Sequence, residues 1–455
     1  MKDLVHNITV AVIGAGPVGL AAAAHLKARG VTPIVLERGQ QAGQAIQEWG
    51  HVRVFTPWQY VTDKAVVKLL EQHDWTHPDA GHLPTGQEIV DEYLVPAASL
   101  PELKNTIIYD ANVTAISKRG LSKSSSFNRD DVVFTVHYRT RQGTHHVIEA
   151  DAVIDASGTW YSPNPIGADG LPVVGEQELS AFIDYGIPKV HGQDRPLYEG
   201  KRTLVLGGGH SAINAALDIL RLKDENSDTK LIWGLRRDNL ERLLGGGIND
   251  ELPARGALGV AAKKAIDEGA LQLIAPMSVQ KIARSDDGLA VDILVDGQRQ
   301  AIVVDRIIVA AGFRPDLDML RELRLDLDQV VEAPTQLAPL IDPNLHSCGT
   351  VRPHGVAELS HPDKNFFIVG MKAYGRAPTF LLLTGYEQVR SIADELVGNH
   401  DAARIIELNL PETGVCNSRP QASAHGVTSA DADNDGGGCC GVAAREEAAA
   451  TSCCR

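Results

Sequence analysis

A short apolar run near the start of the chain leads into three closely spaced glycines, in ITVAVIGAGPVGLAAAAHLKARGVTPIVLERG. Gly14, Gly16 and Gly19 follow the pattern GxGxxG, and Glu37 ends the next apolar run. In a mononucleotide-binding βαβ unit, such glycines allow the tight turn, the approach of a pyrophosphate and close helix–strand packing, while the acidic residue bonds the ribose. The sequence therefore predicts a parallel α/β fold and a dinucleotide held by these four residues, with Arg38 beside them.

The pattern returns in KRTLVLGGGHSAINAALDIL, after a second apolar run at 203–206. Gly207 and Gly209 keep the first two glycine positions, and Ala212 replaces the third glycine with the next smallest residue. We expect these residues, with Ser211 at the start of the following helix, to bind a second dinucleotide through the helix N-terminus.

The residues that end the next apolar run differ between the two units, and they indicate which nucleotide the second unit binds. Arg236 and Arg237 stand where Glu37 stands in the first unit. A guanidinium binds a 2′-phosphate through paired hydrogen bonds, whereas a carboxylate would repel it. The sequence therefore favours NADPH over NADH in the second unit, and the alternative is a solvated basic turn.

Two nucleotide-binding units in one chain, the first near its start, indicate that the second unit is inserted into the first. Apolar runs that end in small residues occur at 150–165, 304–316 and 365–371, where an inserted domain needs them. Gly312 and Gly370 lie near the ends of two of these stretches and are expected to contact a cofactor. The sequence thus predicts two Rossmann-like domains.

Charge and apolar patterning exclude several classes of protein. The formal net charge of −15 would be repelled by nucleic acid and by anionic lipid. No stretch reaches the roughly 18 consecutive apolar residues of a membrane-spanning helix. Six cysteines in 455 residues do not make a disulfide framework. We therefore expect a cytoplasmic protein without nucleic-acid or membrane partners, with a homodimer left open.

Longer stretches of the chain resemble a known family. They are EWGHVRVFTPWQY at 48–60, LPTGQEIVDEYLVP at 83–96 and GMKAYGRAPTFLLLTGYEQVRS at 370–391. With the two glycine units and the terminal cysteine pairs, they are similar to NADPH-dependent flavin monooxygenases, and among these to the flavoprotein monooxygenases encoded in bacterial arsenic-resistance operons. The resemblance covers essentially the whole chain. It implies FAD in the first unit, NADPH in the second, and a soft nucleophile such as a trivalent arsenical as the small-molecule substrate.

With these cofactors, the predicted fold is α/β with the NADPH domain inserted into the FAD domain. The expected domains are a first part of the FAD-binding domain (1–165), the NADPH-binding domain (166–312), a second part of the FAD-binding domain (313–410) and a flexible cysteine-rich tail (411–455).

The segment at 48–60 follows the first βαβ unit, where we expect the chain to cross the isoalloxazine ring of the flavin. Trp49 is an expected cofactor contact, and His51, Arg53 and Trp58 are the expected catalytic residues because they offer ring contacts and hydrogen-bond donors. The alternative is that both tryptophans are core residues and that His51 is a satisfied interior imidazole.

After Leu410 the chain has almost no large apolar side chain, which predicts a flexible extension. Its two cysteine pairs, Cys439-Cys440 and Cys453-Cys454, offer soft thiolate donors. We expect these four residues to bind a soft metal or metalloid ion, such as trivalent arsenic, mercury, copper(I) or zinc. The alternative is an inert tail.

Disulfide reductases of this architecture hold a CxxC or CxxxxC pair beside the flavin, and the body of this chain has only Cys348. The leading hypothesis is therefore an oxidoreductase, a FAD-dependent, NADPH-oxidising monooxygenase acting in arsenic resistance. One alternative is an NADPH-dependent reductase of metal ions or disulfides that uses the terminal cysteine pairs. Another is a soft-metal-binding flavoprotein without turnover.

Overall fold

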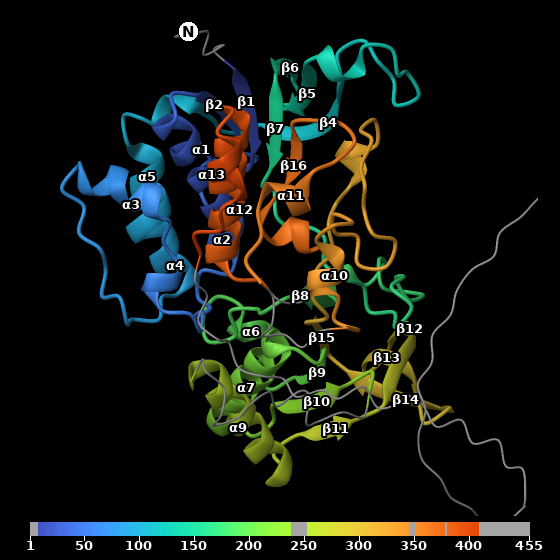
Figure 1. The fold of residues 1–455 in the computed structure, drawn as a ribbon. Helices are drawn as coiled ribbons and strands as arrows, with labels where there is room; N and C mark the ends of the chain where they lie inside the picture. Colours follow the sequence, from blue (N-terminus) through green and yellow to red (C-terminus); the bar gives the residue numbers. More distant parts are fainter. Residues whose placement is uncertain (1–7, 238–252, 346–351, 378–379, 409–455) are drawn as a thin grey trace, which may run out of the picture. The chain divides into compact units, whose positions relative to one another are not determined.

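The computed structural model describes residues 8–237, 253–345, 352–377 and 380–408. The first sheet has five parallel strands in the order β16-β7-β1-β2-β3 (Figure 1). Its strands are β1 (Thr9–Ile13), β2 (Thr32–Leu36), β3 (Ile107–Ile108), β7 (Ala152–Asp155) and β16 (Phe366–Ile368). Each is short, and all but β3, whose Ile108 is exposed, are mostly buried.

The second sheet also has five parallel strands, in the order β11-β10-β9-β15-β8. Its strands are β8 (Ile183–Tyr185), β9 (Arg202–Leu206), β10 (Lys230–Gly234), β11 (Gln272–Ile274) and β15 (Arg306–Val309). All five lie in the chain between β7 and β16 of the first sheet, so the second Rossmann-like unit is inserted into the first. The predicted fold class is confirmed. We call the parts of the chain around the two sheets the first lobe and the second lobe.

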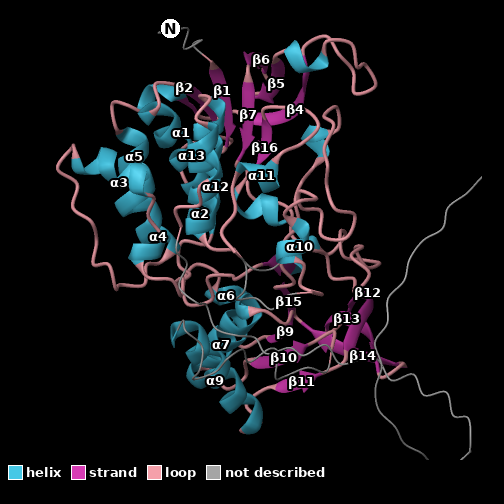
Figure 2. Ribbon diagram, in the orientation of Figure 1, coloured by secondary structure: helices cyan, strands magenta, loops and turns pink. Residues whose placement is uncertain are grey.

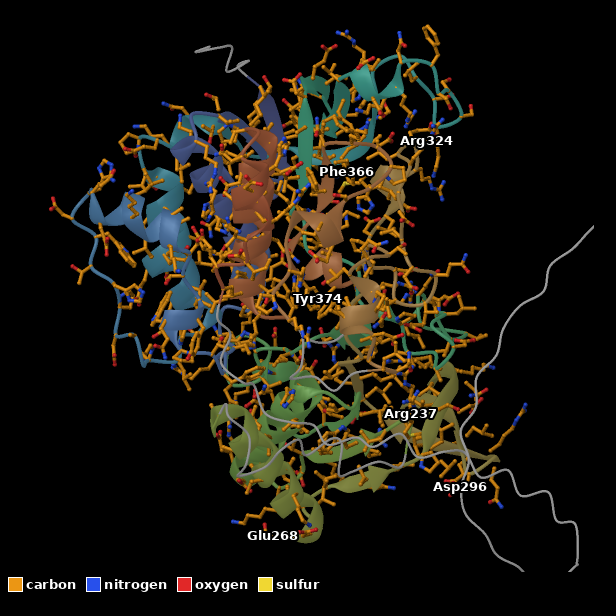
Figure 3. All side chains as sticks on the ribbon, viewed as in Figure 1. Arg237, Glu268, Asp296, Arg324, Phe366 and Tyr374 are labelled. Atoms are coloured by element: carbon orange, nitrogen blue, oxygen red, sulfur yellow. The ribbon has the colours of Figure 1, made fainter. Side chains whose placement is uncertain are left out.

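Two smaller antiparallel sheets accompany the parallel ones and were not predicted from the sequence. One has the order β4-β5-β6 and the other β12-β13-β14. Their strands are β4 (Asn112–Lys118), β5 (Phe134–Arg139), β6 (His145–Ala150), β12 (Met277–Ser285), β13 (Gly288–Val295) and β14 (Gln298–Val304). Asp296 and Gly297, both with positive φ, turn the chain between β13 and β14 (Figure 3 labels Asp296).

The first lobe is built around α1 (Pro17–Ala28), which packs between the first sheet and α12 (Leu382–Leu396). The four alanines at 21–24 are buried, because the helix has neighbours on several sides. A Cβ atom added to Gly385 would lie 2.6 Å from the Val18 side chain. The absence of a side chain at Gly385 therefore lets the first turn of α12 approach the first turn of α1.

Helices cover one face of the second sheet, and the antiparallel sheet β12-β13-β14 packs on its other face (Figure 2). In the second lobe, α7 (His210–Glu225) packs against α9 (Pro253–Asp267). The remaining α-helices of the described residues are α2 (Gln44–Glu48), α3 (Lys64–Glu71), α4 (Gly86–Ile89), α5 (Val95–Ser99), α6 (Arg195–Tyr198), α10 (Ala338–Ile341), α11 (Val356–Leu359) and α13 (His400–Arg404). A π-helical turn, Val90–Leu94, joins α4 to α5. In the described ranges, no helix combines the length and apolar character that crossing a bilayer requires.

Candidate functional site

The first glycine turn has the geometry of an anion cradle. Gly14 has φ 98°, and a Cβ atom on it would lie 2.9 Å from the carbonyl oxygen of Ala156. A Cβ atom on Gly19 would overlap the carbonyl oxygen of Gly14, so this glycine allows α1 to pack on the turn. Around Gly16, the N-cap of α1, a Cβ atom would meet nothing within 4 Å. The open space in front of this helix N-terminus fits a pyrophosphate.

Glu37 is buried at the end of β2 and holds the glycine turn. Its Oε2 accepts a hydrogen bond from the backbone N–H of Ala15 at 2.7 Å, and its Oε1 accepts one from Gly39 at 2.6 Å. Burial raises the pKa of Glu37, and the two backbone bonds act in the opposite direction. The carboxylate therefore supports the turn directly, while its bond to a ribose stays a prediction. The neighbouring Arg38 is exposed, and its guanidinium lies 3.8 Å from the ring centre of Tyr161.

The second glycine turn repeats this construction. Gly207 has φ 142°, and a Cβ atom on it would overlap the carbonyl oxygen of Ala310, directly after the neighbouring strand β15. Gly209 is the N-cap of α7 and has open space around its Cβ position. Ala212 is buried under the turn and Ser211 is half-buried in the first turn of the helix. This helix N-terminus also fits a phosphate group.

Arg236 and Arg237 directly follow β10 and Leu235, and both side chains are exposed. The Nη1 of Arg236 donates a long hydrogen bond of 3.3 Å to the carbonyl oxygen of Ala168. Figure 3 labels Arg237 on the second lobe. The two guanidinium groups thus follow the strand next to β9 and its glycine turn, as the predicted 2′-phosphate contact requires.

The chain passes between the lobes through two paired segments, 156–165 and 310–316, which we call the crossover. Pro163 and Phe313 form an antiparallel bridge. The N–H of Asn164 donates to the carbonyl oxygen of Gly312, and the N–H of Arg314 donates to that of Ser162, both at 2.9 Å. Gly312, with φ 86°, therefore has a structural role in the crossover, and its predicted contact with a cofactor stays a prediction.

A buried ion pair joins two turns of the first lobe, and sequence reasoning missed it. The Nζ of Lys372 lies 2.7 Å from Oδ2 of Asp155, and the two side chains are 1% and 0% exposed. Lys372 also donates to Oγ of Ser157 at 3.1 Å. Asp155 ends β7, and Lys372 belongs to a 3-10 helix, η8 (Gly370–Tyr374), that follows β16 (Figure 3 labels Phe366 on β16 and Tyr374 on η8).

Gly370 begins this short helix with φ 68°. Its N–H donates to Oε1 of Gln388 at 2.7 Å, and Nε2 of Gln388 lies 2.8 Å from Nε2 of His354. Burial lowers the pKa of His354, which favours the neutral imidazole. The N–H of Gly370 is thus already used by the protein, so its predicted contact with a cofactor would have to come from its lack of a side chain.

Two of the expected catalytic residues have buried polar atoms without a partner. Trp58, in a 3-10 helix (Trp58–Tyr60), is fully buried, as the alternative of a core residue requires. Its Nε1 and the Nε2 of His51 have no hydrogen-bond partner among the described residues. Burial lowers the pKa of His51. Buried polar atoms are normally paired, so both nitrogens are candidates to bond a bound molecule.

Arg53 and Trp49, unlike His51 and Trp58, have side chains whose partners are identified within the first lobe. The Arg53 side chain is 52% exposed, bonds the carbonyl oxygen of Leu83 and lies 3.7 Å from Glu88. The Trp49 ring packs on Gly86, where a Cβ atom would lie 2.8 Å from it. These two side chains thus face the segment 83–88.

The segment 48–60 also reaches the second lobe. The ring of Phe55 lies 5.4 Å from that of His210, the first residue of α7, directly after Gly209. The charges of Lys189 and Asp218 act on His51. The segment that follows the first nucleotide-binding unit therefore contacts the helix whose N-terminus forms the second one.

In the described part of the chain, no group of three or more histidine, cysteine or acidic side chains has the arrangement of a metal site. The predicted thiolate ligands Cys439, Cys440, Cys453 and Cys454 lie outside the described residues.

Comparison with known proteins agrees with this construction. Residues 11–349 match the family described as pyridine nucleotide-disulphide oxidoreductase. The chain is 26% identical over 234 residues to a ferredoxin–NADP reductase of Thermus thermophilus, a match that covers 50% of this chain and 60% of that protein. It is 29% identical over 213 residues to flavin-containing monooxygenase ustF1 of Aspergillus flavus, covering 46% and 50%. The chain thus spans about half to three fifths of the length of these curated relatives.

Solved structures of both reductases and monooxygenases share the fold. Bacillithiol disulfide reductase Bdr (YpdA) from Bacillus cereus superimposes with a TM-score of 0.63 at 20% identity, over 86% of this chain and 99% of that one. The ornithine N-hydroxylase KtzI of Kutzneria sp. 744 superimposes with a TM-score of 0.56 at 17% identity, over 87% and 100%. At these identities the likeness shows the fold.

Proposed function

Since the chain belongs to the pyridine nucleotide-disulphide oxidoreductase family, we propose that this oxidoreductase is an NADPH-dependent FAD monooxygenase that oxidises a soft nucleophile, a trivalent arsenical, in arsenic resistance. The observation that carries the proposal is the pair of helix N-termini, each with a glycine cradle, that the segment 48–60 connects through the contact of Phe55 with His210. The cofactors are FAD and NADP(H).

The residues of the first glycine turn would bind FAD. Gly14, Gly16 and Gly19 would accept the pyrophosphate of FAD in front of α1, and Glu37 keeps that turn in place. When bound, FAD takes two electrons from NADPH and passes them to an acceptor. In the reaction proposed here, one atom of O2 goes to the substrate and the other leaves as water, formed with the hydride of NADPH, which carries its two electrons, and one proton from solvent.

The second turn would hold NADPH in the same way. Gly207 and Gly209 leave space for its pyrophosphate at the start of α7, and the exposed guanidinium groups of Arg236 and Arg237 would bind its 2′-phosphate. His51 and Trp58 would offer their unpaired ring nitrogens to the bound cofactors or substrate. Burial keeps His51 uncharged at neutral pH, because it lowers the pKa of the imidazole.

Oxygen is favoured as the electron acceptor because the chain lacks a CxxC or CxxxxC pair, which a disulfide reductase of this architecture needs. The similarity to a flavin-containing monooxygenase of Aspergillus flavus supports the same choice. The similarity to ferredoxin–NADP reductases and the two terminal cysteine pairs favour a second candidate, a reductase of metal ions or disulfides.

The terminal cysteines would serve either function by binding the soft substrate. Cys439-Cys440 and Cys453-Cys454 can offer three thiolates to one trivalent arsenic. We expect Cys439→Ser with Cys440→Ser to weaken arsenical binding and to leave the flavin content unchanged. Loss of flavin from that variant would contradict a separate tail.

One assay separates the candidates. The purified protein is mixed with NADPH with and without a trivalent arsenical, under air and under argon, and oxidation of NADPH is followed by absorbance. Consumption that needs oxygen and is stimulated by the arsenical supports the monooxygenase. Turnover under argon with mercuric ion or a disulfide supports the reductase, and absence of turnover under every condition supports a binding protein.

A further inference from the structure

Besides Lys372, which bonds Ser157, a carboxylate of the first lobe holds the crossover. Glu48, at the end of α2, accepts a hydrogen bond from Nε1 of Trp160 at 2.6 Å and another from the hydroxyl of Tyr161 at 2.7 Å. The two donors are consecutive residues of the crossover, more than a hundred positions away in the chain. Both distances are short, as expected for neutral donors that bond an ionised carboxylate.

The ring of Trp160 also contacts residues beyond its own segment of the crossover. Its ring centre lies 5.0 Å from that of Phe313, in the other segment of the crossover. The same ring packs on Gly186, directly after β8, where a Cβ atom would lie 3.3 Å from it. Trp160 thus lies against the other segment of the crossover and against the residue that follows β8, the edge strand of the second sheet.

Tyr161 is held from two sides. Its hydroxyl bonds Glu48, and the guanidinium of Arg38 covers its ring at 3.8 Å. Burial raises the pKa of Tyr161 above its ordinary value, and the bond to Glu48 acts in the same direction. The phenol therefore stays protonated and remains a donor over the whole range of physiological pH.

We propose that Glu48 is a positioning residue, which fixes the crossover through Trp160 and Tyr161 and so sets the placement of the second lobe for reduction of the flavin by NADPH. This inference rests on the proposed function, since it assigns Glu48 a part in electron transfer between the two bound cofactors.

Four variants test the proposal, each removing one part of the connection. Glu48→Ala removes both acceptors, and Glu48→Gln removes the charge and one of the two acceptor oxygens. Trp160→Phe removes the indole donor but keeps a ring against Phe313, and Tyr161→Phe removes only the hydroxyl. Gln47→Ala is the matched control, because Gln47 lies on the same short helix and bonds Gln41 within the first lobe.

Two measurements are made on the FAD-loaded proteins. The first is the rate at which NADPH bleaches the flavin under argon in a stopped-flow instrument. The second is backbone hydrogen exchange in the segments 156–165 and 310–316. We expect Glu48→Ala to lower the reduction rate by about tenfold or more, since small misplacements of reacting groups are costly. The reduction rate of Glu48→Gln should lie between those of Glu48→Ala and the wild type. Hydrogen exchange in both crossover segments should be faster in Glu48→Ala than in the wild type.

Combining Glu48→Ala with Trp160→Phe should slow reduction little beyond Glu48→Ala alone, because both changes break the same bond. Flavin content and reduction by dithionite should match the wild type in every variant. A Glu48→Ala protein with wild-type reduction rate or wild-type exchange would overturn the proposal. If NADPH does not reduce the wild-type flavin, the proposed function fails, and the exchange measurement still decides whether Glu48 orders the crossover.

Discussion

The Asp155–Lys372 ion pair brings together residues 217 positions apart in the chain. An apolar strand that ends in an acidic residue is visible in the sequence, but nothing in it identifies the lysine that lies opposite. The same limit applies to the segment 48–60. Its place after the first βαβ unit could be predicted, whereas the placement of Arg53 and Trp49 against 83–88 depends on long-range packing.

Removing one partner of this pair should destabilise the protein strongly. Lys372→Met leaves the Asp155 carboxylate buried without its counterion, which costs about 3–5 kcal/mol in comparable cases. We expect urea unfolding to show a lower free energy of unfolding for this variant. The double variant Asp155→Asn with Lys372→Met should recover most of the loss, because no uncompensated charge remains. Equal losses in the single and double variants would contradict this explanation.

At the scale of elements, both βαβ units lie where the sequence predicts them. Glycine spacing and apolar runs are local signals, and β1, α1 and β2 follow from them directly. The two antiparallel sheets were missed, although the Asp296-Gly297 turn is a known hairpin signal. The approach of α12 to α1 at Gly385 could not be predicted, since it depends on a contact between distant parts of the chain.

Adding a methyl group at this contact should separate the two helices. In Gly385→Ala the new Cβ atom would lie 2.6 Å from the Val18 side chain and 2.9 Å from the ring of Phe380. We expect the free energy of unfolding to fall by about 1–3 kcal/mol, the usual cost of overpacking. Gly81→Ala is the control, because its nearest neighbour would be 3.8 Å away. Similar unfolding curves for the two variants would show that the helices have room to adjust.

For the whole molecule, the insertion of one nucleotide-binding unit into another was predicted from the order of the motifs alone. The pairing of the two crossover segments was not, because it depends on where the chain returns from the second lobe. The terminal cysteines lie outside the described residues, so their predicted role is unchanged.

The stability of the whole molecule should fall on mild acidification. Burial lowers the pKa of His361 from 6.5 to about 4. Between these values the unfolded chain takes up a proton that the folded one does not, so stability is full above pH 6.5 and is lost as the pH falls towards 4. The loss from this residue amounts to about 3 kcal/mol at most.

Urea unfolding at several pH values checks this expectation. His361→Asn removes the titrating group and keeps an acceptor for the N–H of Asp326, which bonds Nδ1 of His361. The variant should therefore lose less stability between pH 7 and pH 5 than the wild type. If the free energy of unfolding of His361→Asn falls with pH as steeply as that of the wild type, groups other than His361 cause the loss of stability.

The adjacency of the two crossover segments has a bearing on how such a chain could arise. Asn164 and Gly312 are hydrogen-bonded neighbours, so the segment between them leaves the first lobe and returns to it at the same place. A gene segment encoding the second lobe could thus be acquired, exchanged or deleted at a single locus without rerouting any strand of the first sheet. The second lobe is thus a separable insertion in the first. Selectivity for NADPH can therefore evolve separately from the FAD site.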